Sequence, residues 1–441
     1  MNKMTQMSVN KLLINVSLPI MLALFIQALY TIVDSIFIAN YSESALASIS
    51  LVYPISMMII SLSVGLAIGM GACLAKSLGE KKDQEANNIL IHGIIITLIV
   101  WFILALITLL FAKEFFLQFS DDLTIVNQAY RYAIITTVFG FGIFVQIMLE
   151  RVFQATGYSI LNLKMQIVGT IINIILDPIL IFGLGFIPSL GIIGAAIATV
   201  LGQIIGCLYG FRVIKKQVNE VSITLHDFSY DPKIVKRIFD ISLSAILVTS
   251  ISTFMMVGMN YILALESELA ISVFSIYIKL QQFVFMPIFG LSNATLAIVS
   301  YNYGANLKDR MIDTVHSAIK ITISIMITGT ILFQLFNVTA LNMFKANTLM
   351  LEIGKPLLII ISYSFVFAGI SLIYSSVLQA INKSIYSLIN TLIRGLILPL
   401  VLSYFIYLNY GLNYIWYSFI IAEVIGAIYI YYIYQREIKK I

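Results

Sequence analysis

The chain has very little charge for its length. Only 11% of its 441 residues are Asp, Glu, Lys or Arg, whereas 60% are hydrophobic. Soluble domains carry about 25% charged residues, so a water-soluble fold could not bury this much apolar surface. Lipid must therefore surround most of the chain, because apolar stretches of about 20 residues, enough to cross the hydrocarbon as a helix, recur throughout the sequence.

The sequence is also poor in cysteine and histidine. Its two cysteines, Cys73 and Cys207, lie in apolar stretches and offer neither a disulfide framework nor a CxxC zinc site. The three histidines, His92, His226 and His316, are scattered, and no HExxH or GxSxG pattern occurs. These absences argue against an intramembrane enzyme, and we expect no cofactor.

Apolar windows between polar breaks predict an all-α membrane protein with twelve transmembrane helices. The longest break, residues 214–235, is the expected cytoplasmic linker between an N-terminal six-helix lobe, 1–213, and a C-terminal six-helix lobe, 236–441. The expected helices lie near 12–40, 48–76, 89–112, 127–154, 163–186, 191–213, 236–264, 271–300, 314–336, 351–380, 386–408 and 411–434.

The distribution of Lys and Arg predicts the orientation, because basic residues favour the cytoplasmic side. Most of the 26 basic residues fall in the segments that are cytoplasmic if both termini lie inside. The sequence therefore predicts a multi-pass protein of the cytoplasmic membrane. The net charge of +5 then reflects topology and is no footprint of nucleic-acid binding.

The two halves show weak internal similarity. Glycines recur at one constant spacing, so that Gly65 matches Gly290 and Gly79 matches Gly304. Because each half has six helices, both enter the membrane in the same sense. This predicts two bundles related by a parallel pseudo-twofold axis, with a cavity between them, which suits alternating access.

Polar residues within the spans of the N-terminal half point to a site. Asp34, Asn173, Asp177 and Thr199 fall at a similar depth if each residue adds about 1.5 Å along a helix. Intramembrane acids are costly and mark functional sites by default. These oxygens could hold Na⁺ or exchange protons; the alternative is a structural role near Pro178.

The second half lacks these acids. Met259 stands at the repeat position of Asp34, and Leu398 at that of Asp177. The clear intramembrane acid of this half is Glu423, for which we expect a structural ion pair with Arg394.

Other polar residues could line a cavity for the transported compound. Gln27 and Tyr30 share the helix face of Asp34, although packing explains them equally well, and Gln281 in the eighth helix is a further candidate. Glu150 and Arg151 fall near the cytoplasmic end of the fourth helix, where we expect a solvated helix end or a contact between lobes.

With these residues in place, the sequence resembles the multidrug and toxin extrusion (MATE) family over nearly its whole length. The matching pieces are Leu18-Pro19, Val33-Asp34-Ser35-Ile36-Phe37-Ile38, Gly65-Leu66-Ala67-Ile68-Gly69, Asn173-Ile174-Ile175-Leu176-Asp177-Pro178 and Gly194-Ala195-Ala196-Ile197-Ala198-Thr199.

The resemblance implies an antiporter that expels cationic or amphipathic organic compounds in exchange for Na⁺ or H⁺. It implies that Asp34, Asn173, Asp177 and Thr199 bind the cation, and that Gln27 and Tyr30 contact the compound or the aspartate. We expect a monomer in the lipid bilayer, with no nucleic-acid partner. The alternative within the superfamily is a lipid-linked precursor flippase, whose pyrophosphate cargo requires several Arg or Lys residues in the cavity; within the spans the sequence places Lys279 and Arg394.

Overall fold

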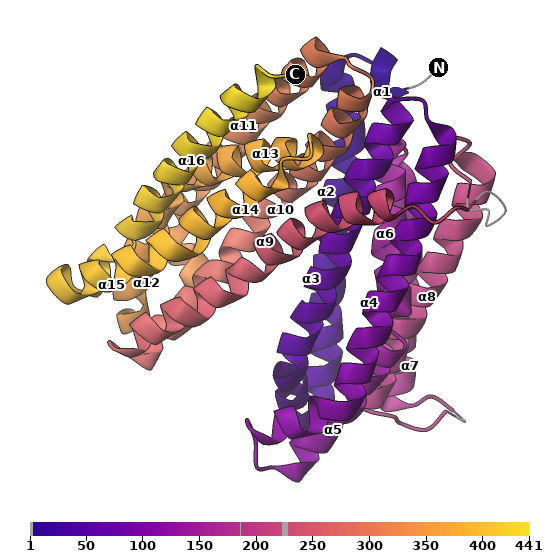
Figure 1. Cartoon of the computed structure of the whole chain (residues 1–441). Coiled ribbons are helices and arrows are strands. Elements are labelled where there is room, and N and C mark those ends of the chain that lie inside the picture. Colours follow the sequence, from indigo (N-terminus) through magenta and orange to yellow (C-terminus); the bar gives the residue numbers. More distant parts are fainter. Residues whose placement is uncertain (1–2, 186, 223–227, 345) are drawn as a thin grey trace. The chain divides into compact units, whose positions relative to one another are not determined.

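The computed structural model describes residues 3–185, 187–222, 228–344 and 346–441, and these form helices joined by short loops (Figure 1). The elements are α1 (Lys3–Gln6), α2 (Val9–Tyr41), α3 (Glu43–Gly79), α4 (Asp83–Leu117), α5 (Leu123–Val138), α6 (Phe141–Ala155), α7 (Ser159–Phe182), α8 (Ile192–Gln217), α9 (Pro232–Ala264), α10 (Glu268–Gly304), α11 (Lys308–Asn342), α12 (Thr348–Ser362), α13 (Phe365–Ala380), α14 (Ser384–Leu392), the π-helix η1 (Ile393–Ile397), α15 (Leu398–Tyr410), the 3-10 helix η2 (Leu412–Tyr414) and α16 (Tyr417–Ile438).

These elements provide the twelve predicted spans. In the described part of the chain, ten helices are long and apolar enough to cross a membrane, and two bent pairs supply one span each. The expected fourth and tenth helices, 127–154 and 351–380, are therefore wrong as single helices: α5 and α6 meet at 45°, and α12 and α13 at 49°.

Local chemistry explains both bends. At the first bend, a Cβ atom on Gly140 would lie 2.5 Å from the carbonyl oxygen of Thr136, so only glycine fits. At the second, the hydroxyl of Ser364 donates to the carbonyl of Ile361 over 2.7 Å. A helix break inside a membrane requires such compensation, because lipid offers no hydrogen bonds.

The internal repeat reappears in the backbone. Left-handed φ angles occur at Lys81 and again at Asn306, and at Gly157 and again at Asn382. Both pairs have the same sequence spacing as Gly65 and Gly290. Since left-handed conformations are uncommon outside glycine, these coincidences at one spacing support duplication of a six-span unit.

The helix caps repeat with the backbone. Ser42 accepts a hydrogen bond from the Ala45 N–H at the start of α3, and Ser267 accepts one from the Ala270 N–H at the start of α10. The two serines have that same spacing. The duplicated unit has therefore kept the local signal that begins its second long helix.

The chain forms two compact units. Unit 1 comprises Met1–Met21 and Leu247–Ile441, and unit 2 comprises Leu22–Ile246, so α2 and α9 each contribute to both. The expected lobes, 1–213 and 236–441, remain a prediction about which parts move together. The expected linker, 214–235, is shorter in the structure, because α8 continues to Gln217 and α9 begins at Pro232; its residues 223–227 lie outside the described residues.

Close packing at glycines explains why parts of α2 and α9 belong to different units. In unit 2, a Cβ on Gly65 would lie 2.3 Å from Ile246 Cγ1, so the first half of α9 packs directly on α3. In unit 1, a Cβ on Gly290 would lie 2.6 Å from Met21 Cγ, so the first half of α2 packs on α10. The two contacts correspond in the duplication: Gly290 is the repeat position of Gly65, and Met21 is the repeat position of Ile246. In the first contact the glycine precedes its partner in the chain, and in the second it follows its partner.

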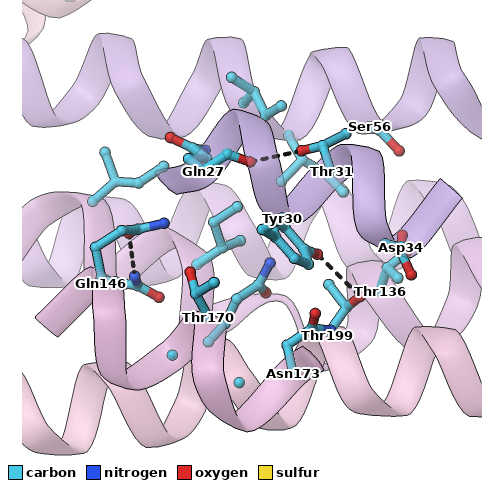
Figure 2. A pocket seen from close by; sticks show the side chains of 18 of the residues that line it. Gln27, Tyr30, Thr31, Asp34, Ser56, Thr136, Gln146, Thr170, Asn173 and Thr199 are labelled. Carbon is cyan, nitrogen blue, oxygen red and sulfur yellow. Dashed lines mark hydrogen bonds between the residues drawn. The ribbon is translucent and has the colours of Figure 1, made fainter. Parts of the chain in front are cut away.

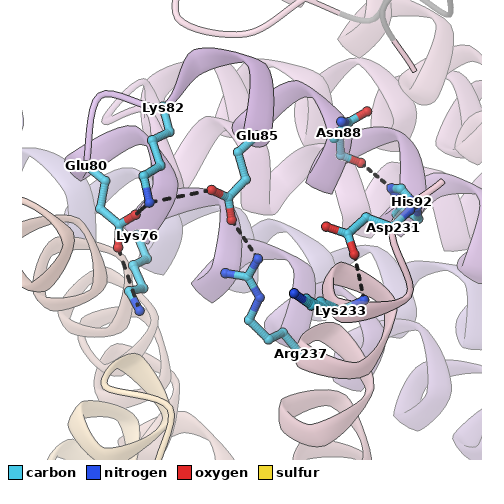
Figure 3. Close-up of polar contacts among 9 residues, drawn as sticks. All are labelled: Lys76, Glu80, Lys82, Glu85, Asn88, His92, Asp231, Lys233 and Arg237. Atoms are coloured by element: carbon cyan, nitrogen blue, oxygen red, sulfur yellow. Dashed lines mark hydrogen bonds and ion pairs between the residues drawn. The ribbon is translucent and has the colours of Figure 1, made fainter. Parts of the chain in front are cut away.

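A polar network joins α4 to the end of the linker within unit 2 (Figure 3). Arg237 donates to Glu85 over 2.6 Å, and Glu85 also lies 3.8 Å from Lys82. His92 lies within hydrogen-bonding distance of the Asn88 carbonyl, at 2.8 Å, and its Nε2 accepts from the Asp231 N–H. His92 thus has a structural role at this end of the bundle.

Unit 1 contains a buried aromatic core and an ion pair. Trp416 is fully buried and stacks on Phe274. Within the π-helix η1, Arg394 donates from Nη1 to both carboxylate oxygens of Glu423, over 2.7 and 2.9 Å. The pairing expected between these two residues is therefore present.

Candidate functional site

Unit 2 contains a cavity of about 270 Å³ between α2, α3, α5, α6, α7 and α8 (Figure 2). Apolar side chains from α3 form part of its wall, and polar side chains face it from the other helices. The polar side chains that matter below are Gln27, Tyr30, Asp34, Gln146, Glu150, Gln166, Asn173, Thr199 and Gln203.

Small residues bring the site together by allowing α7 and α8 to approach closely. A Cβ on Gly202 would lie 2.7 Å from the Gly169 carbonyl oxygen and 3.0 Å from Asn173 Cβ. Gly169 has a matching constraint, since its Cβ would lie 3.0 Å from the Gly202 carbonyl oxygen. Small residues at such interfaces let membrane helices pack backbone to backbone. This contact places Asn173 of α7 beside Thr199 of α8.

The acids of α2 and α7 form the charged part of the site. Asn173 Nδ2 donates to Asp177 Oδ1 over 3.2 Å, one helical turn apart. Asp177 is fully buried behind the cavity wall and interacts electrostatically with Asp34. Three buried oxygens have no hydrogen-bond partner among the described residues: Asp34 Oδ1, Asn173 Oδ1 and Asp177 Oδ2.

A second contact links α2 to α8. The hydroxyl oxygens of Tyr30 and Thr199 lie 3.2 Å apart, and the Tyr30 ring points from α2 toward Thr199 in Figure 2. Tyr132 of α5 also borders the cavity, and Asp34 acts on it electrostatically. Sequence reasoning missed Tyr132, although its place among the apolar residues of a span was a usable indication.

These oxygens fit a small monovalent cation or a proton. Buried polar atoms are nearly always paired, so three unpaired acceptors at one place point to a missing positive partner. Carboxylate, amide and hydroxyl oxygens suit hard cations. In the described ranges, groups of three or more His, Cys, Asp or Glu that could hold a metal are absent. Two carboxylates with neutral oxygens could hold a small cation or share protons.

The other end of the cavity differs from what the sequence suggested. Gln146 of α6 donates to Gln166 of α7 over 3.0 Å, a hydrogen bond drawn as the dashed line at Gln146 in Figure 2. Glu150 lies one turn further along α6 and also borders the cavity. The expected solvated helix end at Glu150 and Arg151 is wrong. Glu150 is half-buried and borders the cavity, while Arg151 is only 6% exposed and donates to Gln154.

The structure also places the remaining candidates. Gln27 borders the cavity beside Tyr30, whereas Gln281 lies on α10 in unit 1, is half-buried, and is not part of this cavity wall. The predicted cation ligands Asp34, Asn173 and Thr199 border the cavity, and Asp177 adjoins it through Asn173.

A family model decides what kind of protein this is. The MatE model matches residues 19–179 and again residues 241–405, which together cover most of the chain. The chain belongs to the MatE family. The two matches lie in the two halves, as the internal repeat requires, and the chain is a multi-pass MatE transporter rather than an enzyme.

Characterised relatives agree with this assignment. The multidrug export protein MepA of Staphylococcus aureus (strain N315) is 25% identical over 422 residues, covering 95% of this chain and 92% of its own length. MepA of Staphylococcus haemolyticus (strain JCSC1435) is 26% identical over 427 residues with the same coverage.

Solved structures confirm the twelve-helix MatE fold. "Crystal structure of MATE in complex with MaL6" has a TM-score of 0.92 at 24% identity, covering 99% of this chain and 98% of that one. A superfamily transporter from Pyrococcus furiosus, whose structure is described as having a binding pocket of reverse polarity that suggests a different function, has a TM-score of 0.91 at 24% identity, covering 99% and 97%. The fold alone therefore does not identify the transported compound, which has to be inferred from the residues of the cavity.

Proposed function

We propose that this protein is a multidrug efflux antiporter that exports cationic or amphipathic organic compounds in exchange for Na⁺ or H⁺ by alternating access. The observation that carries the proposal is the group of three unpaired buried oxygens, Asp34 Oδ1, Asn173 Oδ1 and Asp177 Oδ2, beside a cavity large enough for part of a drug-sized molecule. The naming of relatives at 25 and 26% identity as multidrug export proteins supports the cargo class.

The mechanism follows from electrostatics at Asp34 and Asp177. When their carboxylates are charged, they attract a cationic compound to the cavity. An ion or proton arriving from outside neutralises them and weakens that attraction, so the compound leaves. Coupling requires that the ion bind the outward and inward states with different affinity. Asp34 and Tyr30 are on α2 and Asn173 is on α7, so neutralisation changes the forces between these helices.

Cell-membrane localisation with both termini in the cytoplasm is part of the proposal, as is action as a monomer. The basic residues near the ends of α3 and α8, Lys76, Lys215 and Lys216, support this orientation, since basic residues collect on the cytoplasmic side.

A lipid-linked precursor flippase is less well supported. Pyrophosphate recognition needs Arg or Lys side chains, and the cavity wall in the described part of the chain includes none, whereas it includes Asp34 and Glu150. Binding of a lipid pyrophosphate together with a failure to export cationic dyes would reverse this ranking.

The deciding experiment is efflux of ethidium from proteoliposomes, driven separately by a sodium gradient and by a pH gradient. We expect one gradient to drive efflux in the wild type, and Asp34→Asn and Asp177→Asn to abolish the dependence on it. Asp121→Asn, which changes an exposed aspartate before α5, is the matched control and should behave as the wild type. Full coupling in both site variants would refute the assignment.

A further inference from the structure

Glu150 is an acid in the cavity that the antiport mechanism above does not use. The structure shows no hydrogen bond or ion pair between its carboxylate and another described residue. Arg151 attracts it electrostatically but is directed elsewhere: Arg151 donates to Gln154, and its Cβ would lie 2.9 Å from a Cβ on Gly71 of α3. A carboxylate at membrane depth that faces a cavity without a partner is a functional candidate.

The surroundings of Glu150 offer acceptors for a positive group. Gln146 stands one turn away on the same face of α6. Its amide nitrogen donates to Gln166, and its Oε1, which lies near Gly206 of α8, is buried without a partner among the described residues. Gln203 of α8 borders the same part of the cavity. Gln146 itself is 6% exposed. Unpaired acceptors on a carboxylate and an amide, with no basic side chain in the described wall, suit the ammonium, amidinium or iminium group of an organic cation.

Glu150 is well separated from the proposed coupling site. The Gln146–Gln166 hydrogen bond fixes the level of α6 against α7, and these helices run in opposite directions across the short loop between Ala155 and Ser159. From the level of this hydrogen bond, Asn173 lies seven residues along α7 away from the loop. Glu150 lies four residues along α6 toward the loop. At 1.5 Å per residue, Glu150 and Asn173 are about 16 Å apart along the helix axes.

We propose that Glu150, with Gln146, binds the positive group of the cargo, at a site distinct from the carboxylates that exchange the coupling ion. The inference rests on the proposed efflux function and deepens it by assigning cargo selectivity and ion coupling to opposite ends of one cavity. A cationic compound then binds with its charge at Glu150 and its apolar body against the α3 wall. Cargo and ion then bind different oxygens, and the ion releases the cargo by lowering the negative charge of the whole cavity and by changing the forces between α2 and α7.

The test compares two dyes that share a benzophenoxazine ring system but differ in charge: Nile blue, a cation at neutral pH, and Nile red, which is neutral. Their Kd values for the purified full-length protein are measured by fluorescence anisotropy. A charge-assisted hydrogen bond contributes about 1.5–3 kcal/mol, so Glu150→Gln should raise the Kd for Nile blue by about tenfold or more, with a much smaller change for Nile red. Glu150→Asp should keep most of the preference for the cation.

Glu114→Gln, at an exposed site near the end of α4, is the matched control and should preserve the ratio of the two Kd values. An unchanged ratio in Glu150→Gln would overturn the proposal, as would an equal loss of both dyes, which would indicate a change in cavity shape. A direct binding measurement also separates this inference from the proposed function, because dye selectivity can be read even if no ion gradient drives efflux.

A measurement on the wild type covers the case in which Glu150→Gln does not fold. Carbodiimide modification followed by peptide mass analysis should label Glu150, which borders the cavity. Nile blue should protect it at least several-fold better than Nile red does, and neither dye has a carboxyl group that would react with the carbodiimide. Equal protection by both dyes, or none, would contradict the assignment.

Discussion

Asn173 donates its side-chain amide to Asp177 across one turn of α7, at 3.2 Å, and this hydrogen bond leaves one oxygen of each side chain without a partner. The bond fixes the orientation of the amide, so Asn173 Oδ1 is held ready to accept. A positive ion placed there would satisfy both residues at once. We therefore propose two roles for Asn173, as a ligand of the coupling ion and as a positioning residue for Asp177.

The first prediction tests this double role. Asn173→Ala should raise the concentration of coupling ion that gives half-maximal ethidium efflux by about tenfold or more, since losing a hydrogen bond to a charged group costs about 1.5–3 kcal/mol. The measurement is the initial rate against sodium concentration at fixed pH, and against pH without sodium. Asn127→Ala, at the exposed start of α5, is the control. An unchanged ion dependence in Asn173→Ala would show that Asn173 is no ligand.

The second prediction concerns Tyr30 and Thr199, whose hydroxyl oxygens lie 3.2 Å apart. Tyr30→Phe and Thr199→Val each remove one partner while keeping the shape. A double-mutant cycle on thermal unfolding in detergent should give a coupling energy of about 1 kcal/mol. The same pairing of Tyr30→Phe with Thr97→Val, a buried threonine of α4 that makes no hydrogen bond through its hydroxyl among the described residues, should be additive. Additivity in the first cycle would mean that the contact carries no energy.

The membrane class and the twelve spans could be predicted because each rests on a large energy. The same argument singled out Asp34 and Asp177, which interact electrostatically beside one cavity. At this composition a soluble fold could not bury its apolar surface away from water. An acid such as Asp34 or Asp177 in lipid is too costly to persist without a role. The bends at Gly140 and Ser364 could not be predicted in the same way, because apolar windows continue across them and only local geometry decides where the helix breaks.

Glu150 lies near the end of α6, as its place in the expected helix 127–154 indicated, but the sequence could not show which way its side chain faces. In the structure α6 turns by 45° from α5, and Glu150 faces the cavity. Tyr132 and Gln166 were missed for a related reason: their functional meaning lies in which helix they face, and a single span does not contain that information.

The third prediction concerns the glycines at which α2 and α9 pack. Alanine normally stabilises a helix relative to glycine by about 1 kcal/mol. Gly65→Ala should instead destabilise by about 1–3 kcal/mol, because the new Cβ would lie 2.9 Å from Ile246 Cα, which cannot rotate away. Gly290→Ala should behave alike, since its Cβ would lie 3.1 Å from Met21 Cα. The measurement is the midpoint of thermal unfolding in detergent.

Gly395 provides the control for that series. A Cβ at this position would make contacts of 3.5 Å, to Ile251 Cγ2 and Thr391 Cγ2, which is ordinary packing distance. Gly395→Ala should therefore be neutral or stabilising. If Gly65→Ala and Gly395→Ala had the same effect, close backbone approach would not be the reason for glycine at position 65.

The fourth prediction uses the ion pair of Arg394 and Glu423, which the sequence suggested and the structure contains. Their side chains are only 10 and 14% exposed, and Arg394 Nε has no partner among the described residues. Removing one partner leaves a buried charge uncompensated, which costs about 3–5 kcal/mol. Glu423→Gln should therefore strongly lower the unfolding midpoint, whereas the double variant Arg394→Met with Glu423→Leu should recover most of the loss, because apolar replacements of buried pairs are often neutral.

A surface pair distinguishes burial from pairing as the cause. Arg237 and Glu85 are closer, at 2.6 Å, yet their side chains are 42 and 25% exposed. Exposed pairs contribute about 0–1 kcal/mol, so Glu85→Gln should shift the unfolding midpoint far less than Glu423→Gln does. Comparable shifts for the two variants would mean that pairing itself, and not the low dielectric around Glu423, determines the cost. In that case the apolar double variant at 394 and 423 should also fail to recover stability, which makes the two measurements a joint test of one physical cause.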